Sequence, residues 1–363
     1  MRIAFDGSCL IASRPTGVEL SFLRTLRAFA RIRPTDQLFL FHPRSHDIHG
    51  LPPNLRSVAL PAGPPALWRR YWLPGQLARM DIQLLLCPTT ALPAKSPCPC
   101  ISTVHEIPAL HAGAEEMGTS SLRHRRARSM LEDRAALVIV PSAWTARDLL
   151  RERPALAGRI RILAQPLDPA FLEARPAEGP GRGFVYLGMD RPRKNLPRLF
   201  RAWTALGENA RRGESLTWIG APPGRRAPPG LRFLPALPLA DVIDEIRRAR
   251  ALLLPSLSEG FGLPVFEALA LGRPFLASVG SVHQELLADH EPPLGVFADP
   301  RNSSALAEAL QTLLYDVDLT NAALLHGRRV VSDMSPENTA LGWQRLAHEL
   351  LPPSRADRGE QSP

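Results

Sequence analysis

The sequence contains little cysteine and no long hydrophobic run. Four of its 363 residues are cysteines, which favours reduced thiols over a disulfide framework. Cys98 and Cys100 flank Pro99, where a metal pair is an alternative, but no second Cys or His pair completes a zinc pattern. No apolar run approaches the roughly 20 residues of a membrane-spanning helix, and the N-terminal MRIAFDGSCL has none of the features of a signal peptide. We therefore expect a cytoplasmic protein.

Lysine is also scarce. Of 44 basic residues only Lys95 and Lys194 are lysines, and the excess of basic over 35 acidic residues gives a formal net charge of +9. The use of arginine and proline throughout the chain indicates a compositional bias, so we expect most arginines on the solvated surface. A lysine in such a chain is less easily explained as a merely solvated charge.

Two basic clusters stand out from this background. They are Arg123, Arg125, Arg126 and Arg128 near His124, and Arg69 and Arg70 beside Trp68, Tyr71 and Trp72. Basic and aromatic residues together suit an anionic membrane surface or a lipid-linked phosphate acceptor. They also suit nucleic acid. A charged face covering a helix is the simpler interpretation of each cluster taken alone.

The length suits two domains of about 150–180 residues, and both halves alternate apolar runs with amphipathic stretches. This alternation predicts helices between the strands of parallel sheets. The expected strands are 2–5, 38–41, 56–60, 81–87, 101–105, 137–141, 160–164, 184–187, 216–219, 232–234, 251–254 and 274–277. The expected helices are 18–31, 142–153, 196–206, 241–249, 264–271, 305–314 and 336–350.

A change of composition marks the predicted domain boundary. Residues 175–183, RPAEGPGRG, combine proline, glycine and charge with few apolar side chains, which is typical of a linker. We predict an N-terminal domain over 1–175, a C-terminal domain over 184–335 and a helix over 336–351 that packs back toward the N-terminal domain. Residues 352–363 are predicted to be a disordered tail.

The densest functional signal is the segment 254–277, LPSLSEGFGLPVFEALALGRPFLA. A buried strand runs into a loop that carries Glu259, Gly260 and Gly262, and Pro264 stands near the start of the next helix, with Glu267 expected in its first turn. Ligands of open α/β sheets bind at the carboxyl ends of strands, and helix N-termini favour phosphate. A carboxylate there accepts hydrogen bonds from the vicinal hydroxyls of a ribose. The segment therefore predicts a site for a phosphorylated, polyhydroxylated ligand, and a plain turn is the alternative.

This segment resembles the signature of glycosyltransferase family 4, in which seven residues separate two glutamates, here Glu259 and Glu267. The resemblance covers nearly the whole chain to about residue 350. It implies an α/β protein of the GT-B type, with two Rossmann-like domains whose parallel sheets face each other across a cleft. It also implies a retaining, mannosyltransferase-like enzyme that needs no metal, and the chain has no Asp-x-Asp metal motif.

The resemblance assigns residues to the donor, a nucleotide-sugar of the GDP-mannose or UDP-hexose type. In FVYLGMDRPRKNLPRLF, Lys194 takes the position of the cation that holds the donor's diphosphate, and Gly188 ends the strand. Met189 stands where an arginine is common, so Arg193 or Arg191 substitutes as a second phosphate contact. Glu267 is expected to hold the ribose. The donor contacts also include residues 259–263, Glu259, Gly260, Phe261, Gly262 and Leu263.

The N-terminal half resembles the acceptor domain of the family more loosely. Gly17 belongs to a glycine loop, RPTGVEL, in which Glu19 replaces a common second glycine. His105, followed by Glu106, stands at a strand end and is expected to hydrogen-bond the transferred sugar or the acceptor hydroxyl, as Glu259 does for the sugar. Pro166 departs from a usual glycine. Glu285 stands in a familiar place of the donor domain, and a helix N-terminal acid is an equal alternative for it.

These residues predict transfer of a hexose to a saccharide or lipid-linked saccharide acceptor in envelope polysaccharide or lipopolysaccharide synthesis. His105, Glu259 and Lys194 are the catalytic candidates, with no cofactor beyond the donor. Peripheral contact with the inner face of the membrane is a further expectation, and we expect no nucleic-acid partner. The alternatives are a sugar-nucleotide epimerase, a phosphorylase, a non-catalytic nucleotide-sugar-binding protein and, with little support from the motifs, a basic nucleic-acid binder.

Overall fold

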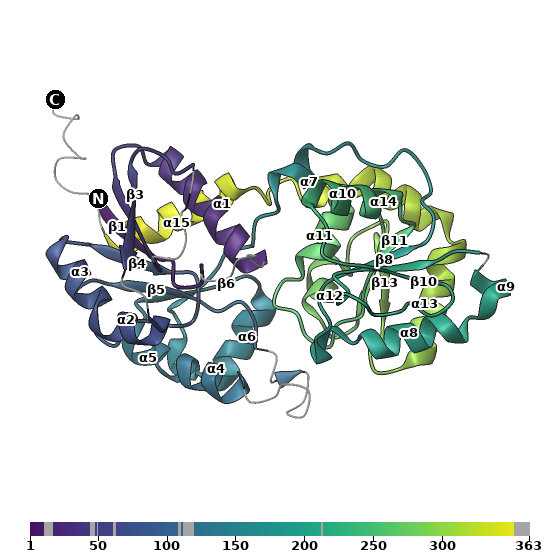
Figure 1. Cartoon of the computed structure of the whole chain (residues 1–363), viewed down its shortest axis with the longest axis horizontal. Coiled ribbons are helices and arrows are strands. Elements are labelled where there is room, and N and C mark those ends of the chain that lie inside the picture. Colours follow the sequence, from purple (N-terminus) through teal and green to yellow (C-terminus); the bar gives the residue numbers. More distant parts are fainter. Residues whose placement is uncertain are drawn as a thin grey trace. The chain divides into compact units, whose positions relative to one another are not determined.

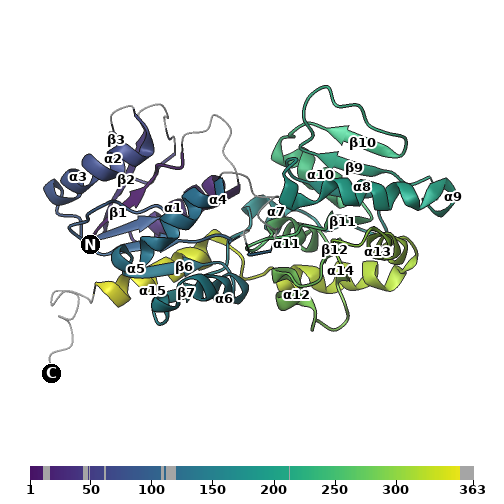
Figure 2. The same ribbon diagram turned by 90° about the horizontal axis from the view of Figure 1, so that it is seen from below.

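A computed structural model describes residues 1–10, 17–43, 48, 50–60, 63–107, 110–111, 120–211 and 213–351. The chain forms two compact units, drawn in Figures 1 and 2. Unit 1 comprises Met1–His105, Thr119–Pro166 and Pro336–Pro363, and unit 2 comprises Glu106–Gly118 and Leu167–Ser335. The predicted tail, 352–363, and the loop of residues 11–16 before Gly17 lie outside the described residues.

Unit 1 is built on a parallel seven-stranded sheet of order β3-β2-β1-β4-β5-β6-β7. Its strands are β1 (Arg2–Asp6), β2 (Gln37–Pro43), β3 (Leu55–Leu60), β4 (Leu84–Cys87), β5 (Cys100–Thr103), β6 (Leu137–Val140) and β7 (Ile160–Ile162). Its helices are α1 (Gly17–Ile32), α2 (Pro65–Tyr71), α3 (Leu73–Arg79), α4 (Ser120–Ser129), α5 (Leu131–Arg134), α6 (Ala143–Glu152), the 3-10 turn η2 (Pro154–Leu156) and α15 (Pro336–Leu350).

Both faces of this sheet are covered. Figure 1 shows α1 and α15 on one face and α2, α3 and α5 on the other. Because successive side chains of a strand point to opposite faces, Ile3 and Phe5 of β1 join the core beneath α1 and α15, and Ala4 between them is buried on the other face. Burial on both sides explains why the sequence shows continuous apolar runs at these strands.

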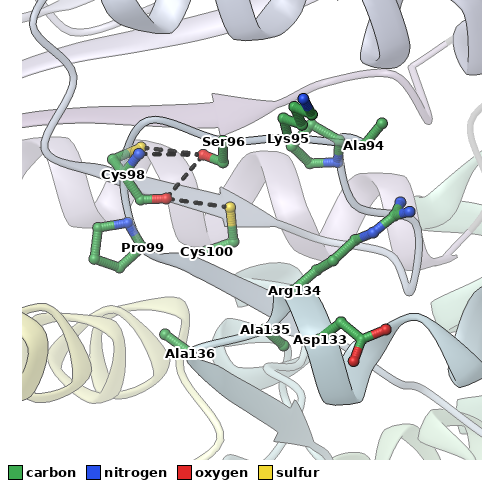
Figure 3. A pocket seen from close by; sticks show the side chains of 11 residues that line it. Ala94, Lys95, Ser96, Cys98, Pro99, Cys100, Asp133, Arg134, Ala135 and Ala136 are labelled. Atoms are coloured by element: carbon green, nitrogen blue, oxygen red, sulfur yellow. Dashed lines mark hydrogen bonds between the residues drawn. The ribbon is translucent and has the colours of Figure 1, made fainter.

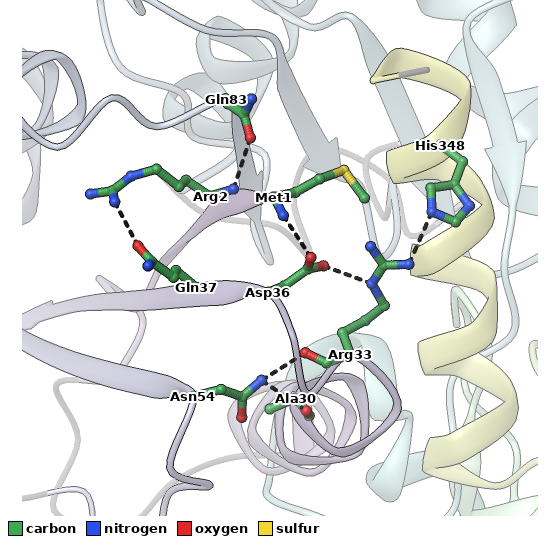
Figure 4. Close-up of polar contacts among 9 residues, drawn as sticks. All are labelled: Met1, Arg2, Ala30, Arg33, Asp36, Gln37, Asn54, Gln83 and His348. Carbon is green, nitrogen blue, oxygen red and sulfur yellow. Dashed lines mark hydrogen bonds and ion pairs between the residues drawn. The ribbon is translucent and has the colours of Figure 1, made fainter. Parts of the chain in front are cut away.

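The last helix belongs to unit 1. Figures 1 and 2 both show α15 beside α1, although the whole of unit 2 separates them in the sequence. Trp343 of α15 packs among Phe5, Phe22 and Phe29, with ring centroids 5.7–6.2 Å apart. At its far end, a ring nitrogen of His348 lies 3.0 Å from Arg33, whose guanidinium also pairs with Asp36 (Figure 4).

Unit 2 has a parallel six-stranded sheet of order β10-β9-β8-β11-β12-β13. Its strands are β8 (Phe184–Leu187), β9 (Leu216–Ile219), β10 (Leu231–Leu234), β11 (Ala251–Leu254), β12 (Phe275–Ser278) and β13 (Gly295–Ala298). Its helices are α7 (Pro169–Glu173), the 3-10 turn η3 (Pro192–Lys194), α8 (Leu196–Ala205), α9 (Gly207–Arg211), α10 (Leu239–Arg248), α11 (Leu263–Ala270), α12 (Val282–Leu287), α13 (Ser303–Tyr315) and α14 (Val317–Val330). In Figure 1, α8 and α13 cover one face, and α10, α11 and α14 cover the other.

The segment 175–183 is bound to unit 2. The Ala177 amide donates to the Leu271 carbonyl, and the buried Arg273 guanidinium donates to the carbonyls of Gly179 and Arg247. A Cβ on Gly181 would lie 1.9 Å from the Ala249 carbonyl oxygen, so glycine permits close backbone packing there. The two compact units divide between Pro166 and Leu167, before this segment.

Several predicted strands are longer than the observed ones. The run 81–87 was expected to be one strand, but Asp81 has a φ of 47° and β4 begins only at Leu84. The strand expected over 101–105 ends at Thr103, so His105 lies two residues beyond β5. Within the described ranges, no helix has the length and apolarity needed to cross a bilayer.

Candidate functional site

The strand order of unit 2 reverses between β8 and β11. Chain order 3-2-1-4-5-6 is that of a Rossmann-type sheet, in which ligands bind beyond the carboxyl ends of the strands on either side of the reversal. The loop after β8 carries Gly188, Arg193 and Lys194, and the loop after β11 carries Glu259 to Gly262. The topology therefore brings together the two segments that the sequence analysis singled out.

Backbone and amide hydrogen bonds join these two loops. Asn195 adopts a left-handed conformation with φ of 61° between η3 and α8, and its side chain is buried. Its amide donates to the carbonyls of Pro255 at 3.0 Å and Pro300 at 2.6 Å. The Leu257 amide donates to the Arg193 carbonyl at 2.8 Å. The cations of one loop are thus held at a fixed place against the carboxylate of the other.

Glu259 is the centre of the charged cluster and is 8% exposed. Lys194 Nζ lies 2.5 Å from its Oε1, and Arg193 Nη1 lies 3.3 Å from its Oε2. Burial raises the pKa of this carboxyl, but Lys194 and Arg193 outweigh that effect and lower the pKa to about 2. Glu259 is therefore fully ionised at neutral pH.

Glu106 is a member of this cluster that the sequence analysis did not assign to the donor. It belongs to unit 2, and its Oε1 lies 3.1 Å from Arg193 Nη2. Burial raises the pKa of Glu106, with Arg193 opposing and Glu259 reinforcing the rise. The two cations and two carboxylates sum to zero charge, so an incoming anion competes with carboxylates for Lys194 and Arg193. No signal in the local sequence connects residue 106 with residue 193.

Gly262 opens α11 and needs to be glycine. Its φ is 72°, in the left-handed region, and a Cβ there would lie 2.2 Å from Nε2 of His283. Nε2 of the buried His283 donates to the Gly262 carbonyl at 3.0 Å, since a carbonyl only accepts. Burial lowers the pKa of His283, which keeps it neutral. His283 thereby holds the loop that carries Glu259 to Gly262 in place, a role that the sequence analysis missed.

The position of Glu267 differs from its prediction. Helix α11 begins at Leu263, with Pro264 second, and has no acidic residue in its first turn. Glu267 is therefore the fifth residue and lies in the second turn, because the helix starts at the residue after Gly262. It is partly exposed and lies four residues after Leu263, on the same face of the helix as that residue. The expectation that Glu267 is a first-turn acid is wrong.

The end of β8 packs tightly around Gly188. Its carbonyl accepts a hydrogen bond from Trp218 Nε1 at 2.7 Å, and its φ is 145°. A Cβ there would lie 3.2 Å from the Tyr186 hydroxyl. Met189, the departure noted in the sequence, is 52% exposed. Glu285 lies in the first turn of α12, where a helix dipole favours an acid.

The two N-terminal candidates belong to unit 1. Gly17 is the exposed first residue of α1, with Glu19 in the first turn of the helix. His105 Nε2 lies 2.8 Å from the Pro88 carbonyl, and its Nδ1 lies 2.7 Å from the Gln165 amide. The carbonyl fixes the hydrogen on Nε2, so Nδ1 accepts from Gln165. Burial lowers the pKa of His105. The histidine is neutral, both ring nitrogens are engaged, and its role in sugar binding stays a prediction.

The cysteine pair also has local partners. Ser96 Oγ lies 3.6 Å from Cys98 Sγ, and Cys100 Sγ donates to the Cys98 carbonyl at 3.6 Å (Figure 3). Burial raises the pKa of both thiols. Among the residues that the structure describes, no group of three or more His, Cys, Asp or Glu side chains is arranged to hold a metal.

The geometry of unit 2 defines a class of protein. Two cations, a glycine that opens a helix and a switch point between β8 and β11 lie together here, an arrangement that nucleotide-binding α/β domains use to bind anions. Lysine and arginine supply charge-assisted hydrogen bonds to phosphate oxygens.

Comparison with known proteins shows which family the chain resembles. Residues 181–316 match the model of the glycosyl transferases group 1. Over this segment the chain resembles that glycosyltransferase family, and the chain has the GT-B fold. It is 26% identical over 228 residues to O-antigen chain mannosyltransferase B of Escherichia coli, an alignment that covers 57% of this chain and 58% of that enzyme. It is 28% identical over 315 residues to glycogen synthase of Mycobacterium tuberculosis H37Rv, covering 81% and 72%.

Solved structures share the fold. Sucrose-phosphate synthase from Thermosynechococcus elongatus superposes with a TM-score of 0.78 at 19% identity, covering 96% of this chain and 98% of that one. Alr3699/HepE of Anabaena, solved in complex with UDP-glucose, superposes with a TM-score of 0.72 at 15% identity, covering 96% and 100%. At these identities the likeness concerns the fold alone.

Proposed function

We propose that this protein transfers a hexose, with retention, from a nucleoside-diphosphate sugar to a saccharide or lipid-linked saccharide acceptor. One observation carries the proposal: Lys194 and Arg193 meet Glu259 beside the glycine that opens α11, at the switch point of unit 2. The complex of Alr3699/HepE with UDP-glucose supports a UDP-hexose donor, and the name of the Escherichia coli relative supports a mannosyl donor such as GDP-mannose and a role in envelope polysaccharide synthesis.

The proposed reaction depends on the charges around the departing diphosphate. Cleavage of the anomeric bond leaves negative charge on the departing diphosphate, so cations and N–H donors at that group accelerate the step. Lys194 and Arg193 supply the cations without a metal, and the backbone of Gly260–Gly262 supplies N–H groups at the start of α11. Glu259, ionised at neutral pH, accepts hydrogen bonds from sugar hydroxyls once the phosphate competes for its two cations. Glu267 holds the ribose.

The acceptor and the place of action belong to the same proposal. On and just after α2, the apolar side chains Leu67, Tyr71 and Trp72 are each more than half exposed, beside Arg70. Exposed aromatic and basic residues suit peripheral contact with an anionic membrane surface. This feature supports a lipid-linked acceptor at the inner membrane face. Trp68 of the same cluster is buried in the core of unit 1 and takes no part.

The first experiment is a thermal-shift panel with GDP-, UDP-, ADP- and dTDP-sugars. The true donor at 100 times its dissociation constant should stabilise the protein by about 2.7 kcal/mol. Lys194→Ala and Glu267→Ala should each abolish that response. Lys95→Ala is the matched control, because Lys95 is the other lysine and lies exposed on a loop of unit 1. A normal response in Lys194→Ala would show that the phosphate assignment is wrong.

Turnover separates the alternatives. A transferase releases nucleoside diphosphate only when an acceptor is present, apart from slow hydrolysis, whereas an epimerase converts the donor without an acceptor. A non-catalytic protein binds the donor in calorimetry and never consumes it. Chromatography of the donor after incubation with and without a mixture of saccharide acceptors distinguishes these results.

A further inference from the structure

Unit 1 contains a cavity of about 270 Å³ into which three helices bring arginines. Arg69 and Arg70 come from the last turn of α2, Arg126 from the last turn of α4 and Arg134 from the end of α5. The rest of the lining is apolar: Ala66, Ala91, Leu92, Ala94, Ala127 and Met130. Among the described residues that line the cavity, none is acidic. Arg126 of one basic cluster of the sequence and Arg69 and Arg70 of the other, separate along the chain, thus meet at one place.

Two of these arginines, Arg126 and Arg134, are not paired with acids in the described part of the chain, unlike the neighbouring Arg128. Arg128, two residues from Arg126, is buried and donates to both oxygens of Glu152 at 2.7 and 2.9 Å. Within the described ranges, the side chains of Arg126 and Arg134 have no hydrogen bond or ion pair with the protein. A helix dipole accounts for one basic residue in a last turn. It does not account for three helices converging on a cavity without an acid.

Arg69 connects the cavity with the edge of the sheet. Its Nη1 donates to Ser8 Oγ at 2.6 Å and lies 3.6 Å from Asp6 Oδ2, and Asp6 is the last residue of β1. The sheet order of unit 1 reverses between β1 and β4, and Leu92 follows β4. The cavity therefore lies beside the switch point of unit 1, the place where ligands of such sheets bind.

A second cavity extends the basic surface. It measures about 350 Å³, shares Ala94 and Arg134 with the first, and is lined by Lys95 (Figure 3). One acid, Asp133, is among its lining residues. Arg134 is therefore reachable from two sides, which leaves its fork of N–H groups open to an anion.

We propose that the arginine-lined cavity of unit 1 binds a phosphate ester, and that this phosphate belongs to the acceptor. Arginine forks pair with phosphate oxygens through two parallel hydrogen bonds, and two or three such cations neutralise a phosphate dianion. The apolar lining contacts the group that the phosphate carries. The assignment to the acceptor rests on the proposed function, whereas the binding of phosphate does not. The phosphate comes either from a lipid headgroup or from a soluble phosphorylated sugar.

Two probes test the cavity by calorimetry with the whole chain: inorganic phosphate and dihexanoyl phosphatidic acid, below its micelle concentration. Arg126→Gln should weaken binding of both probes about tenfold or more. Arg79→Gln is the matched control, because Arg79 is also exposed in the last turn of a unit 1 helix and its replacement changes the net charge equally. It should leave both affinities unchanged. Equal weakening in both variants, or none in Arg126→Gln, overturns the proposal.

The same titrations identify the source of the phosphate. Tighter binding of the lipid probe than of inorganic phosphate, by about tenfold, assigns the cavity to a lipid headgroup, and equal affinities assign it to a soluble ester. Donor titrations on the same samples keep the two hypotheses apart. Arg126→Gln should bind the donor as the unmodified chain does. If the unmodified chain binds phosphate but no nucleotide-sugar, the proposed function is wrong, whereas the proposal that the cavity binds phosphate is retained.

Discussion

The hydroxyl of Tyr186 is buried at the end of β8 without a hydrogen-bond partner in the described part of the chain. Burial raises the pKa of this phenol, with Glu259 adding to the rise, so the hydroxyl stays protonated. A buried hydroxyl without a partner costs about 1–3 kcal/mol. The hydroxyl lies beside Gly188 and the charged cluster, so we expect a bound ligand to supply the missing hydrogen-bond acceptor. Buried polar groups that lack a partner often have such a functional reason.

Tyr186→Phe should therefore raise the free energy of unfolding of the ligand-free protein by about 1 kcal/mol. It should also weaken donor binding several-fold, because the phosphate loses a donor. Urea unfolding and calorimetry measure the two effects. Tyr315→Phe is the control, since the Tyr315 hydroxyl donates to the Ala210 carbonyl and its removal brings no gain. A Tyr186→Phe protein that is more stable but binds the donor equally well would show that the hydroxyl serves no ligand.

At this scale, residue type and motif identified two residues that the fold brings together, but not the residues that contact them. Glu259 and Lys194 follow from the motif, and the fold brings them within 2.5 Å across 65 residues of sequence. Glu106 and His283 act through contacts that only the folded chain creates. The many arginines of the chain also make function hard to see in the sequence. Arg126 and Arg128 look alike there, although among the described residues only Arg128 has an acid partner, the half-buried Glu152.

At the scale of elements, the start of α11 depends on one glycine. Gly262→Ala places a Cβ at a φ of 72° and 2.2 Å from His283 Nε2. The left-handed conformation alone costs a non-glycine residue about 1–2 kcal/mol. The clash adds to this cost and displaces the loop to which we assign the donor phosphates. We expect a loss of stability beyond 2 kcal/mol and a weaker response to the donor in the thermal-shift assay.

Two further variants separate the cost of the left-handed backbone conformation from the cost of the steric clash with His283. Gly224 has a φ of 78° with nothing within 4 Å of an added Cβ, so Gly224→Ala measures the backbone cost alone. Adding His283→Ala to Gly262→Ala removes the atom that the new Cβ meets. If Gly262→Ala lowers the free energy of unfolding no more than Gly224→Ala does, glycine is required at 262 for its backbone conformation and not for the close approach of His283.

Elements with a clear period were predictable, and elements shaped by tertiary contacts were not. Helices α8 and α10 and strands β8 and β11 match their predictions to within two residues at each end, because apolar periodicity is set by the core that they face. Helices α2 and α3 were not predicted, since prolines and glycine interrupt 64–75 and the arginines there were interpreted as a surface cluster. Glu267 was placed one turn too early because helix boundaries depend on capping geometry.

At the scale of the molecule, each unit has its own hydrophobic core and its own parallel sheet. The core of unit 1 is completed only by α15, which the chain forms after the whole of unit 2. Unit 1 therefore cannot fold fully before the last helix is available, whereas the residues of unit 2 other than 106–118 are continuous. With two such cores, we expect unfolding to show more than one transition.

Trp343 tests this division. Trp343→Ala removes an indole that contacts Phe5, Phe22 and Phe29, and a buried Trp to Ala change costs about 3–5 kcal/mol. In calorimetry, one transition should fall by many degrees and the other, which the donor stabilises, should keep its midpoint. Trp72→Ala is the control, because Trp72 is 52% exposed and its loss should move neither transition much. If Trp343→Ala lowers the donor-stabilised transition equally, the two cores unfold together, and α15 supports the whole molecule instead of one unit.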